Sequence, residues 1–276
     1  MGFSLYTTAL DPGLFDRQPS TPSEFPNRAV GRPAAERVRE ADGISIHWPS
    51  APHGRARLVL TRSGARRRYS VPCFRDQERF AHCEAPEEAT GVVLLDACAG
   101  VEFQEQPAKI QYEWLGEIRD HYPDCLVVTG AHKEFWEFKK DHEVEDVFFR
   151  RRAERVAKLL ASLGFAYRLV SARYLMQAAY YRNAIEMRRH AKQLAKYPNW
   201  LVHLSARMTG KAPETAQVAL AFLPQEQRLA ALHSCLYNGI LVTDLSVAIS
   251  LESYVHPPPR TGGGMPWVWE LFEKSS

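Results

Sequence analysis

The sequence of 276 residues lacks a long hydrophobic run, paired cysteines and a large excess of charge of either sign. No apolar stretch is long enough to span a membrane and no secretory signal opens the chain, so we expect a soluble, cytoplasmic protein without a membrane partner. The five cysteines include no Cys-x-x-Cys pair, which argues against a zinc ribbon and a disulfide framework. No glycine-rich phosphate loop is present, so any ATP-driven step would depend on another protein.

The positive charge that is present is clustered. The net charge of +3 is too small by itself to indicate a nucleic-acid-binding protein. Two arginine-rich segments could nevertheless follow a phosphate backbone. We expect DNA contacts from Arg66, Arg67 and Arg68 in one segment and from Arg151 in the other, although a solvated surface is the commoner origin of any single run of this kind.

The stretch 121–140, HYPDCLVVTGAHKEFWEFKK, predicts a β-hairpin. An apolar run, CLVV, is followed by a glycine-containing turn and then by an aromatic run, FWEFK. Because side chains alternate across a strand, Glu137 and Lys139 share one face, and the aromatic side chains beside them point to the other. Asp124 enters from the neighbouring strand, so we expect it beside this polar pair.

Such a group of side chains is suited to phosphodiester chemistry. Two carboxylates on adjacent strands, Asp124 and Glu137, form the hard-oxygen site that Mg²⁺ or Mn²⁺ prefers. Lys139 can orient an attacking water and offset charge on a phosphodiester, so the pattern predicts metal-assisted hydrolysis. The alternative is a half-exposed strand that carries a surface salt bridge.

The segments on either side of the hairpin predict an α/β domain. A helix is expected over 75–96, broken near Pro86, which is tolerated where a helix restarts. Strands are expected at 44–48, 57–62, 101–107 and 110–114. An amphipathic helix of roughly twenty residues follows the hairpin, with Gly164 as its C-terminal cap and a strand at 165–170.

Several of these features occur in a defined order over residues 75–175. They are a glutamate-bearing helix, Leu94-Leu95-Asp96, Glu105-Gln106-Pro107, Tyr122-Pro123-Asp124, Glu137-Phe138-Lys139, a long helix and Gly164-Phe165-x-Tyr167. This order resembles the TnsA family of transposon endonucleases in the PD-(D/E)xK superfamily. The resemblance implies a restriction-endonuclease-like core, a mixed sheet flanked by helices. It also implies that Asp124 and Glu137 bind Mg²⁺, or Mn²⁺ as its substitute, and that Lys139 is the active-site lysine.

The resemblance further implies a catalytic, metal-binding acid on the helix that precedes the Leu-Leu-Asp motif. Its spacing favours Glu88, with Glu84 and Glu87 as alternatives. The proline at position 86 departs from the continuous helix that the family has here. Glu88 also fits the N-terminal charge that a helix dipole favours.

Two other sets of polar residues flank these motifs. Gln106 either lines the site or satisfies backbone groups. His121, His132 and His142 do not have the spacing of zinc ligands, and we expect them at the surface or facing DNA.

Four regions are expected along the chain. They are a flexible arm over 1–45 with a short helix at 34–41, a nuclease domain over 46–170, a helical, winged-helix-like domain over 171–255 and a Pro/Gly-rich tail over 256–276. The third region predicts helices at 172–196, 213–222 and 224–237 and a strand at 239–245; the first helix has a basic face that includes Arg188. The tail ends in an apolar cluster around Trp267, which we expect to dock on the chain's own domain or on a partner.

The chain is therefore expected to be a magnesium-dependent DNA endonuclease. The resemblance implies nicking of double-stranded DNA at the 5′ ends of a mobile element during cut-and-paste transposition. The partners that it implies are a DDE-type transposase and an AAA+ ATPase regulator. A stand-alone PD-(D/E)xK nuclease of restriction or phage-defence type and a catalytically idle DNA-binding scaffold are the alternatives.

Overall fold

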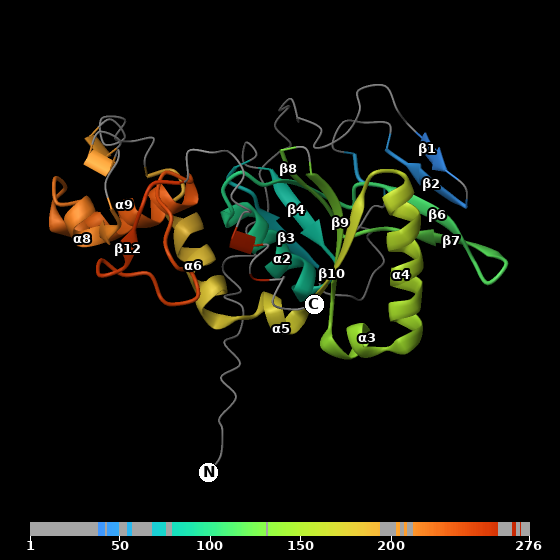
Figure 1. Ribbon diagram of the computed structural model, residues 1–276. Helices are drawn as coiled ribbons and strands as arrows, with labels where there is room; N and C mark the ends of the chain where they lie inside the picture. Colours follow the sequence, from blue (N-terminus) through green and yellow to red (C-terminus); the bar gives the residue numbers. More distant parts are fainter. Residues whose placement is uncertain are drawn as a thin grey trace, which may run out of the picture.

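The computed structural model describes residues 38–41, 43–49, 54–56, 68–75, 79–130, 132–193, 203–204, 207–208, 212–258, 267–268 and 271. Over these residues the fold is mixed α/β, with a mixed sheet and flanking helices (Figure 1). The strand expected at 57–62, Arg66, Arg67 and most of the predicted arm and tail lie outside the described residues. No helix of the described part is long and apolar enough to cross a membrane.

The central sheet has the strand order β10-β9-β8-β5. Its strands are β5 (Glu102–Glu105), β8 (Cys125–Thr129), β9 (His132–Lys139) and β10 (Ala166–Ser171). β8 and β9 pair antiparallel, with Thr129 opposite His132, which confirms the predicted hairpin. β10 runs parallel to β9, with Leu169 opposite Glu137. Parallel neighbours need a crossover, and here it consists of α3 (Asp141–Glu145) and α4 (Val147–Ser162).

A second sheet has the order β1-β2-β6-β7, formed by β1 (Val38–Ala41), β2 (Ile44–His47), β6 (Lys109–Trp114) and β7 (Glu117–His121). β6 and β7 form a hairpin that projects from one end of the molecule (Figure 1). Its two turn residues, Leu115 and Gly116, both have positive φ, 54° and 79°, as a tight hairpin turn requires. The helix expected at 34–41 is wrong over its described part, because residues 38–41 pair with β2 as a strand.

The segment before Pro86 is a hairpin rather than a helix. β3 (Tyr69–Pro72) pairs antiparallel with β4 (Phe80–Cys83), which corrects the helix predicted upstream of the proline. The physical reason is a period-two burial pattern, since Ala81 and Cys83 are buried and the residues before each are half-buried. α2 (Pro86–Ala97) then begins at the proline, as predicted.

The central sheet is covered on both faces. Trp136 and Phe138 of β9 belong to a buried cluster with α2, while Phe135 belongs to a second cluster with α4, β2 and β6. This burial on both sides explains why β8 is buried at four consecutive positions instead of alternating. β9, which pairs with a neighbouring strand on each side, is therefore held between two packed layers.

Gly91 permits the close approach of α2 to β9. A Cβ built at Gly91 would lie 2.4 Å from ring atoms of Phe138. We expect Gly91→Ala to lower the free energy of unfolding, because overpacking costs about 1–3 kcal/mol whereas the gain in helix propensity is at most about 1 kcal/mol. Chemical denaturation of Gly91→Ala, Phe138→Leu and the double variant measures this. The smaller leucine is expected to relieve part of the cost, and a Gly91→Ala variant more stable than wild type would contradict the packing argument.

The chain after β10 is helical but differs from the prediction in detail. It contains α5 (Ala172–Leu175), α6 (Ala178–Arg189), β11 (Glu214–Thr215), α8 (Ala216–Ala219), α9 (Gln225–Tyr237) and β12 (Tyr254–Val255). The predicted first helix is broken into α5 and α6, and the predicted second is reduced to α8. Residues 239–245 are not a strand, since their one ladder contact is a bridge from Val242 to His256. The winged-helix interpretation thereby loses the strand on which it depended.

Arg188 and the apolar cluster of the tail both pack against other parts of the chain. Arg188 does not belong to a basic surface, because it is 3% exposed and its Nε lies 2.8 Å from Oδ2 of the fully buried Asp96. Val268 and Leu271 of the tail are buried in the same cluster as α2 and α9, and Trp267 stacks on Tyr180. The described part of the tail therefore docks on its own chain. The predicted domain boundary near residue 170 remains a prediction, and the buried cluster extends across it.

Candidate active site

Strand pairing brings Asp124 and Glu137 together. Cys125 of β8 pairs with Trp136 of β9, so Asp124, one residue before, comes level with Glu137 on the antiparallel neighbour. The backbone N–H of Phe138 donates to Asp124 Oδ2 at 2.8 Å and fixes this carboxylate against β9. Both carboxylates are buried, with exposures of 7% and 4%. The juxtaposition expected from the sequence is therefore present.

Lys139 lies between the two acids. Its Nζ is 2.9 Å from Glu137 Oε1 and 3.5 Å from Asp124 Oδ2. The side chain is 20% exposed, more than either carboxylate. Lys139 is therefore the most accessible of these three side chains.

These side chains open into a polar cavity of about 360 Å³. All four residues predicted to be catalytic, Glu88, Asp124, Glu137 and Lys139, line it. The other lining residues are Glu84, Tyr112, Arg119, Asp120, His121, Tyr122 and Arg152. Side chains from β6, β7, β9, α2 and α4 thus meet around one hollow.

Of the three candidate acids near the start of α2, only two line the cavity. Glu84 and Glu88 line it, whereas Glu87 does not. Glu88 Oε2 accepts the backbone N–H of Glu84 at 2.9 Å. The charge of Glu88 raises the pKa of both Asp124 and Lys139. Glu88 is therefore the best placed of the three to act together with the hairpin residues.

The sequence analysis did not identify two residues that contact Glu137. His121 was expected at the surface or facing DNA, but its side chain is only 11% exposed and its Nε2 lies 2.9 Å from Glu137 Oε2. The hydroxyl of Tyr167 donates to the same oxygen at 3.1 Å. In the parallel pairing Tyr167 is opposite Phe135, so it shares a face of the sheet with Glu137. The motif containing Tyr167 was visible in the sequence, but its partner could be found only from this register.

Burial and mutual repulsion set the charge states of the acids. Burial, then the charge of Glu137, raises the pKa of Asp124 well above its usual range, and Lys139 only partly opposes this. Burial also acts to raise the pKa of Glu137, but His121 and Lys139 outweigh it and lower the value to about 2. Burial acts to lower the pKa of the Lys139 ammonium, but the charges of Asp124 and Glu137 together outweigh it and raise the pKa above its ordinary range. One ammonium thus serves at least two carboxylates.

The oxygen donors of the site are of the chemical type that a hard divalent cation prefers. Asp124, Glu137 and Glu88 offer carboxylate oxygens, which Mg²⁺ and Mn²⁺ prefer, while burial and then the charge of Glu137 raise the pKa of Asp124. In the described part of the chain, however, no three His, Cys, Asp or Glu side chains converge closely enough to form a ready-made metal-binding cluster. A cation would compete for these oxygens with the Lys139 ammonium, which lies 2.9 Å from Glu137 Oε1 and 3.5 Å from Asp124 Oδ2.

Of the arginines predicted to contact DNA, neither of the two that the structure describes is among the residues that line the cavity. Arg66 and Arg67 lie outside the described residues, and the half-buried Arg68 is not among the residues that line the cavity. Arg151 is exposed on α4 and does not line it either, whereas the adjacent Arg152 does. The packing of α4 therefore turns Arg152 toward the acids, and a DNA contact of Arg151 remains a prediction.

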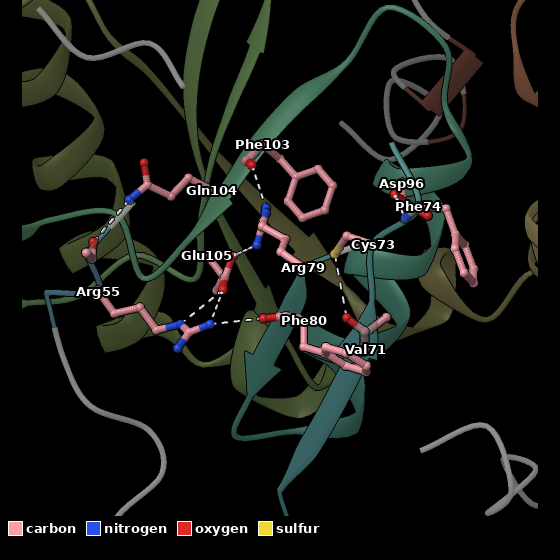
Figure 2. A network of polar contacts seen from close by, with 11 residues as sticks. Arg55, Val71, Cys73, Phe74, Arg79, Phe80, Asp96, Phe103, Gln104 and Glu105 are labelled. Carbon is pink, nitrogen blue, oxygen red and sulfur yellow. Dashed lines mark hydrogen bonds and ion pairs between the residues drawn. The ribbon is translucent and has the colours of Figure 1, made fainter. Parts of the chain in front are cut away.

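An ionic network centred on the buried Glu105 supports the strand that precedes the site. Figure 2 shows Arg55 and Arg79 converging on Glu105, the last residue of β5. Arg55 also donates to the carbonyl of Phe80 at 3.0 Å and Arg79 to that of Phe103 at 2.8 Å. Burial raises the pKa of the Glu105 carboxyl, but the two guanidiniums outweigh it and hold the pKa below its usual value. The two arginines thus tie neighbouring segments to β5, the last strand of the central sheet in the order above.

Gln106 links this network to the acids through its backbone. Its N–H donates to the carbonyl of Asp124, and its own carbonyl accepts the N–H of Ala56, both at 2.9 Å. Its φ is +45°, a strained value for a residue with a side chain. Gln106 does not line the cavity, so of its two predicted roles the structure supports the backbone role.

The comparisons with known proteins add no relative on which to base a function. The chain matches no protein-family model, and a search of curated proteins gave no significant match. The geometry of the site therefore has to carry the functional argument.

Proposed function

We propose that the chain is a metal-dependent DNA endonuclease with a PD-(D/E)xK core, similar to the TnsA family. The observation that carries the proposal is that Glu88, Asp124, Glu137 and Lys139, taken from three separate sequence motifs, line a single polar cavity. A coincidental salt bridge would not need an acid from a helix some fifty residues away in the chain. The mixed sheet with helices on its faces is compatible with the same fold.

The residues of the site have separable roles in this proposal. Asp124 and Glu137, with Glu88, would hold Mg²⁺ or Mn²⁺, which supplies Lewis-acid activation of water and neutralises phosphate charge. Phe138 N–H fixes Asp124, while His121 and Tyr167 hold the far oxygen of Glu137 and leave Oε1 toward Lys139. Lys139, charged because its pKa is raised, donates a hydrogen bond to the attacking water or to the phosphate oxygen on which negative charge develops.

The biological setting proposed is cut-and-paste transposition. In it the chain nicks the 5′ ends of a mobile element, a DDE-type transposase cuts the other strand and an AAA+ ATPase recruits the assembly. This part rests on the sequence resemblance. Neighbouring genes for such a transposase and ATPase would support it, whereas a methyltransferase neighbour would favour a stand-alone nuclease of the restriction type.

The first test of the chemistry is calorimetric titration of Mn²⁺. We expect the wild type to bind Mn²⁺ and both Asp124→Ala and Glu137→Ala to lose the binding heat, because each removes a buried oxygen ligand. Asp120→Ala is the matched control. Asp120 also lines the cavity, but its carboxylate is 44% exposed and is bonded to Gln111 and Lys109.

Two results would count against the proposal. Equal titration curves for wild type, Asp124→Ala and Glu137→Ala would make the acids and Lys139 a structural ion cluster, and the idle scaffold would be the better description. Equal loss in Asp120→Ala would indicate unspecific attraction of the cation to a negative cavity. If the two acids alone matter, nicking of supercoiled plasmid in Mg²⁺ is the next measurement.

A further inference from the structure

The cavity carries positive charge on its rim in addition to its acids. Arg119 projects from β7 and Arg152 from α4, so two elements of different type place a guanidinium at the same hollow. Tyr112 of β6, whose ring is buried, also lines the cavity. Burial raises the pKa of the Tyr112 hydroxyl, and the charges of Arg152 and Arg119 both act against that rise.

Neither guanidinium is neutralised by the acids of the cavity. Within the described residues, Arg119 forms an ion pair with Glu117, its neighbour on β7, and both side chains are more than half exposed. Arg152 stacks over the ring of Phe149, 5.2 Å from its centroid, and has no carboxylate partner among those residues. An exposed ion pair contributes little, so Arg119 can exchange its partner at small cost. Both arginines are therefore available to an anion that enters the cavity.

The buried acids and the exposed arginines place opposite charges at different depths. A phosphodiester that approached the acids alone would be repelled by them. Planar guanidiniums bind phosphate oxygens through two parallel hydrogen bonds, and they do so without losing their charge. Arg119 and Arg152 would thus hold the backbone of a nucleic acid while one of its phosphates faces Asp124, Glu137 and Lys139.

We propose that Arg119 and Arg152 form a two-arginine clamp for the phosphodiester backbone of double-stranded DNA at the mouth of this cavity. The inference rests on the proposed nuclease function and adds the residues that position its substrate. It replaces Arg151, the arginine chosen from the sequence, by its neighbour. The clamp positions the substrate and takes no part in bond cleavage.

The test measures the affinity of wild type, Arg119→Ala and Arg152→Ala for a short DNA duplex. Fluorescence anisotropy of the duplex reports the binding at each of a series of salt concentrations. Ca²⁺ replaces Mg²⁺ so that the duplex stays intact. Each substitution is expected to weaken binding by about tenfold and to reduce the slope of log K against log salt by about 0.9, the value for one phosphate contact. Lys158→Ala is the matched control, because Lys158 is exposed on the same helix and does not line the cavity. We expect its affinity and slope to equal those of wild type.

The outcomes separate this inference from the proposed function. Wild-type affinity and slope in both arginine variants, or no duplex binding by the wild type, would overturn the clamp even if Mn²⁺ binds at Asp124 and Glu137. An equal loss in Lys158→Ala would also overturn it, since attraction would then be diffuse. Weakened, less salt-dependent binding in the two arginine variants alone would support the clamp, even for a chain that fails to bind Mn²⁺ and so loses the hydrolytic proposal. Thermal melting of each variant checks that it is folded.

Discussion

Replacing Lys139 with methionine is expected to abolish DNA nicking while leaving Mn²⁺ binding intact or tighter. The ammonium lies 2.9 Å from one oxygen of Glu137 and 3.5 Å from one of Asp124, where it competes with any cation for the same carboxylates. Its removal takes away that competition and also the group that assists the attacking water. Loss of such a positioned proton donor typically lowers rates by about 10²–10⁴-fold.

The measurement combines Mn²⁺ calorimetry with plasmid nicking on the same preparation. Lys133→Met is the control, because Lys133 stands at the opposite end of β9 and does not line the cavity. We expect it to match the wild type in both assays. If Lys139→Met lost metal binding and nicking together, the lysine would be needed to hold the acids in place. If it nicked DNA at the wild-type rate, Lys139 would have no part in the chemistry.

Removing Arg188 is expected to be the most destabilising single change away from the site. Its partner Asp96 is fully buried, and Asp96 also accepts the backbone N–H groups of Phe74 and Arg75. Arg188 in turn donates to the carbonyl of Pro72. The pair thereby ties α6 to α2 and to the end of β3. Breaking a buried pair strands the remaining charge, which costs about 3–5 kcal/mol.

Chemical denaturation of Arg188→Met measures this cost, with Arg189→Ala as the control. Arg189 is the next residue on α6, but it is 60% exposed and pairs with Glu186 one turn away. Exposed pairs at this spacing contribute about 0.2–0.5 kcal/mol, so the control is expected to be nearly as stable as wild type. Equal effects of the two substitutions would show that Arg188 is not the link between α6 and α2.

The hairpin was predictable because its evidence is local. Alternation along FWEFK places Glu137 and Lys139 on one side, and a short turn fixes the register that brings Asp124 level with Glu137. Pro86 likewise marked the start of α2, since proline is tolerated in the first turn of a helix. These parts of the candidate site follow from neighbours in sequence.

The errors arose where packing overrode local preference. A helix was predicted over Phe80–Cys83, yet burial of Ala81 and Cys83 makes this segment a strand. Residues 239–245 are apolar enough for a strand, but the single bridge to His256 gives them no ladder. Arg188 fitted a basic helix face until its contact with Asp96, 92 residues away, was known.

The sequence by itself determined the chemical character of this protein: two acids and a lysine on a hairpin, an acidic helix start and a mixed α/β chain. Tertiary structure decided which residues meet. It selected Glu88 and Glu84 over Glu87, brought His121 and Tyr167 to Glu137, and turned Arg152 rather than Arg151 toward the cavity. The physical reason is that strand alternation and helix starts are set by residues a few positions apart. The facing of one element toward another depends instead on packing between segments that are distant in the chain.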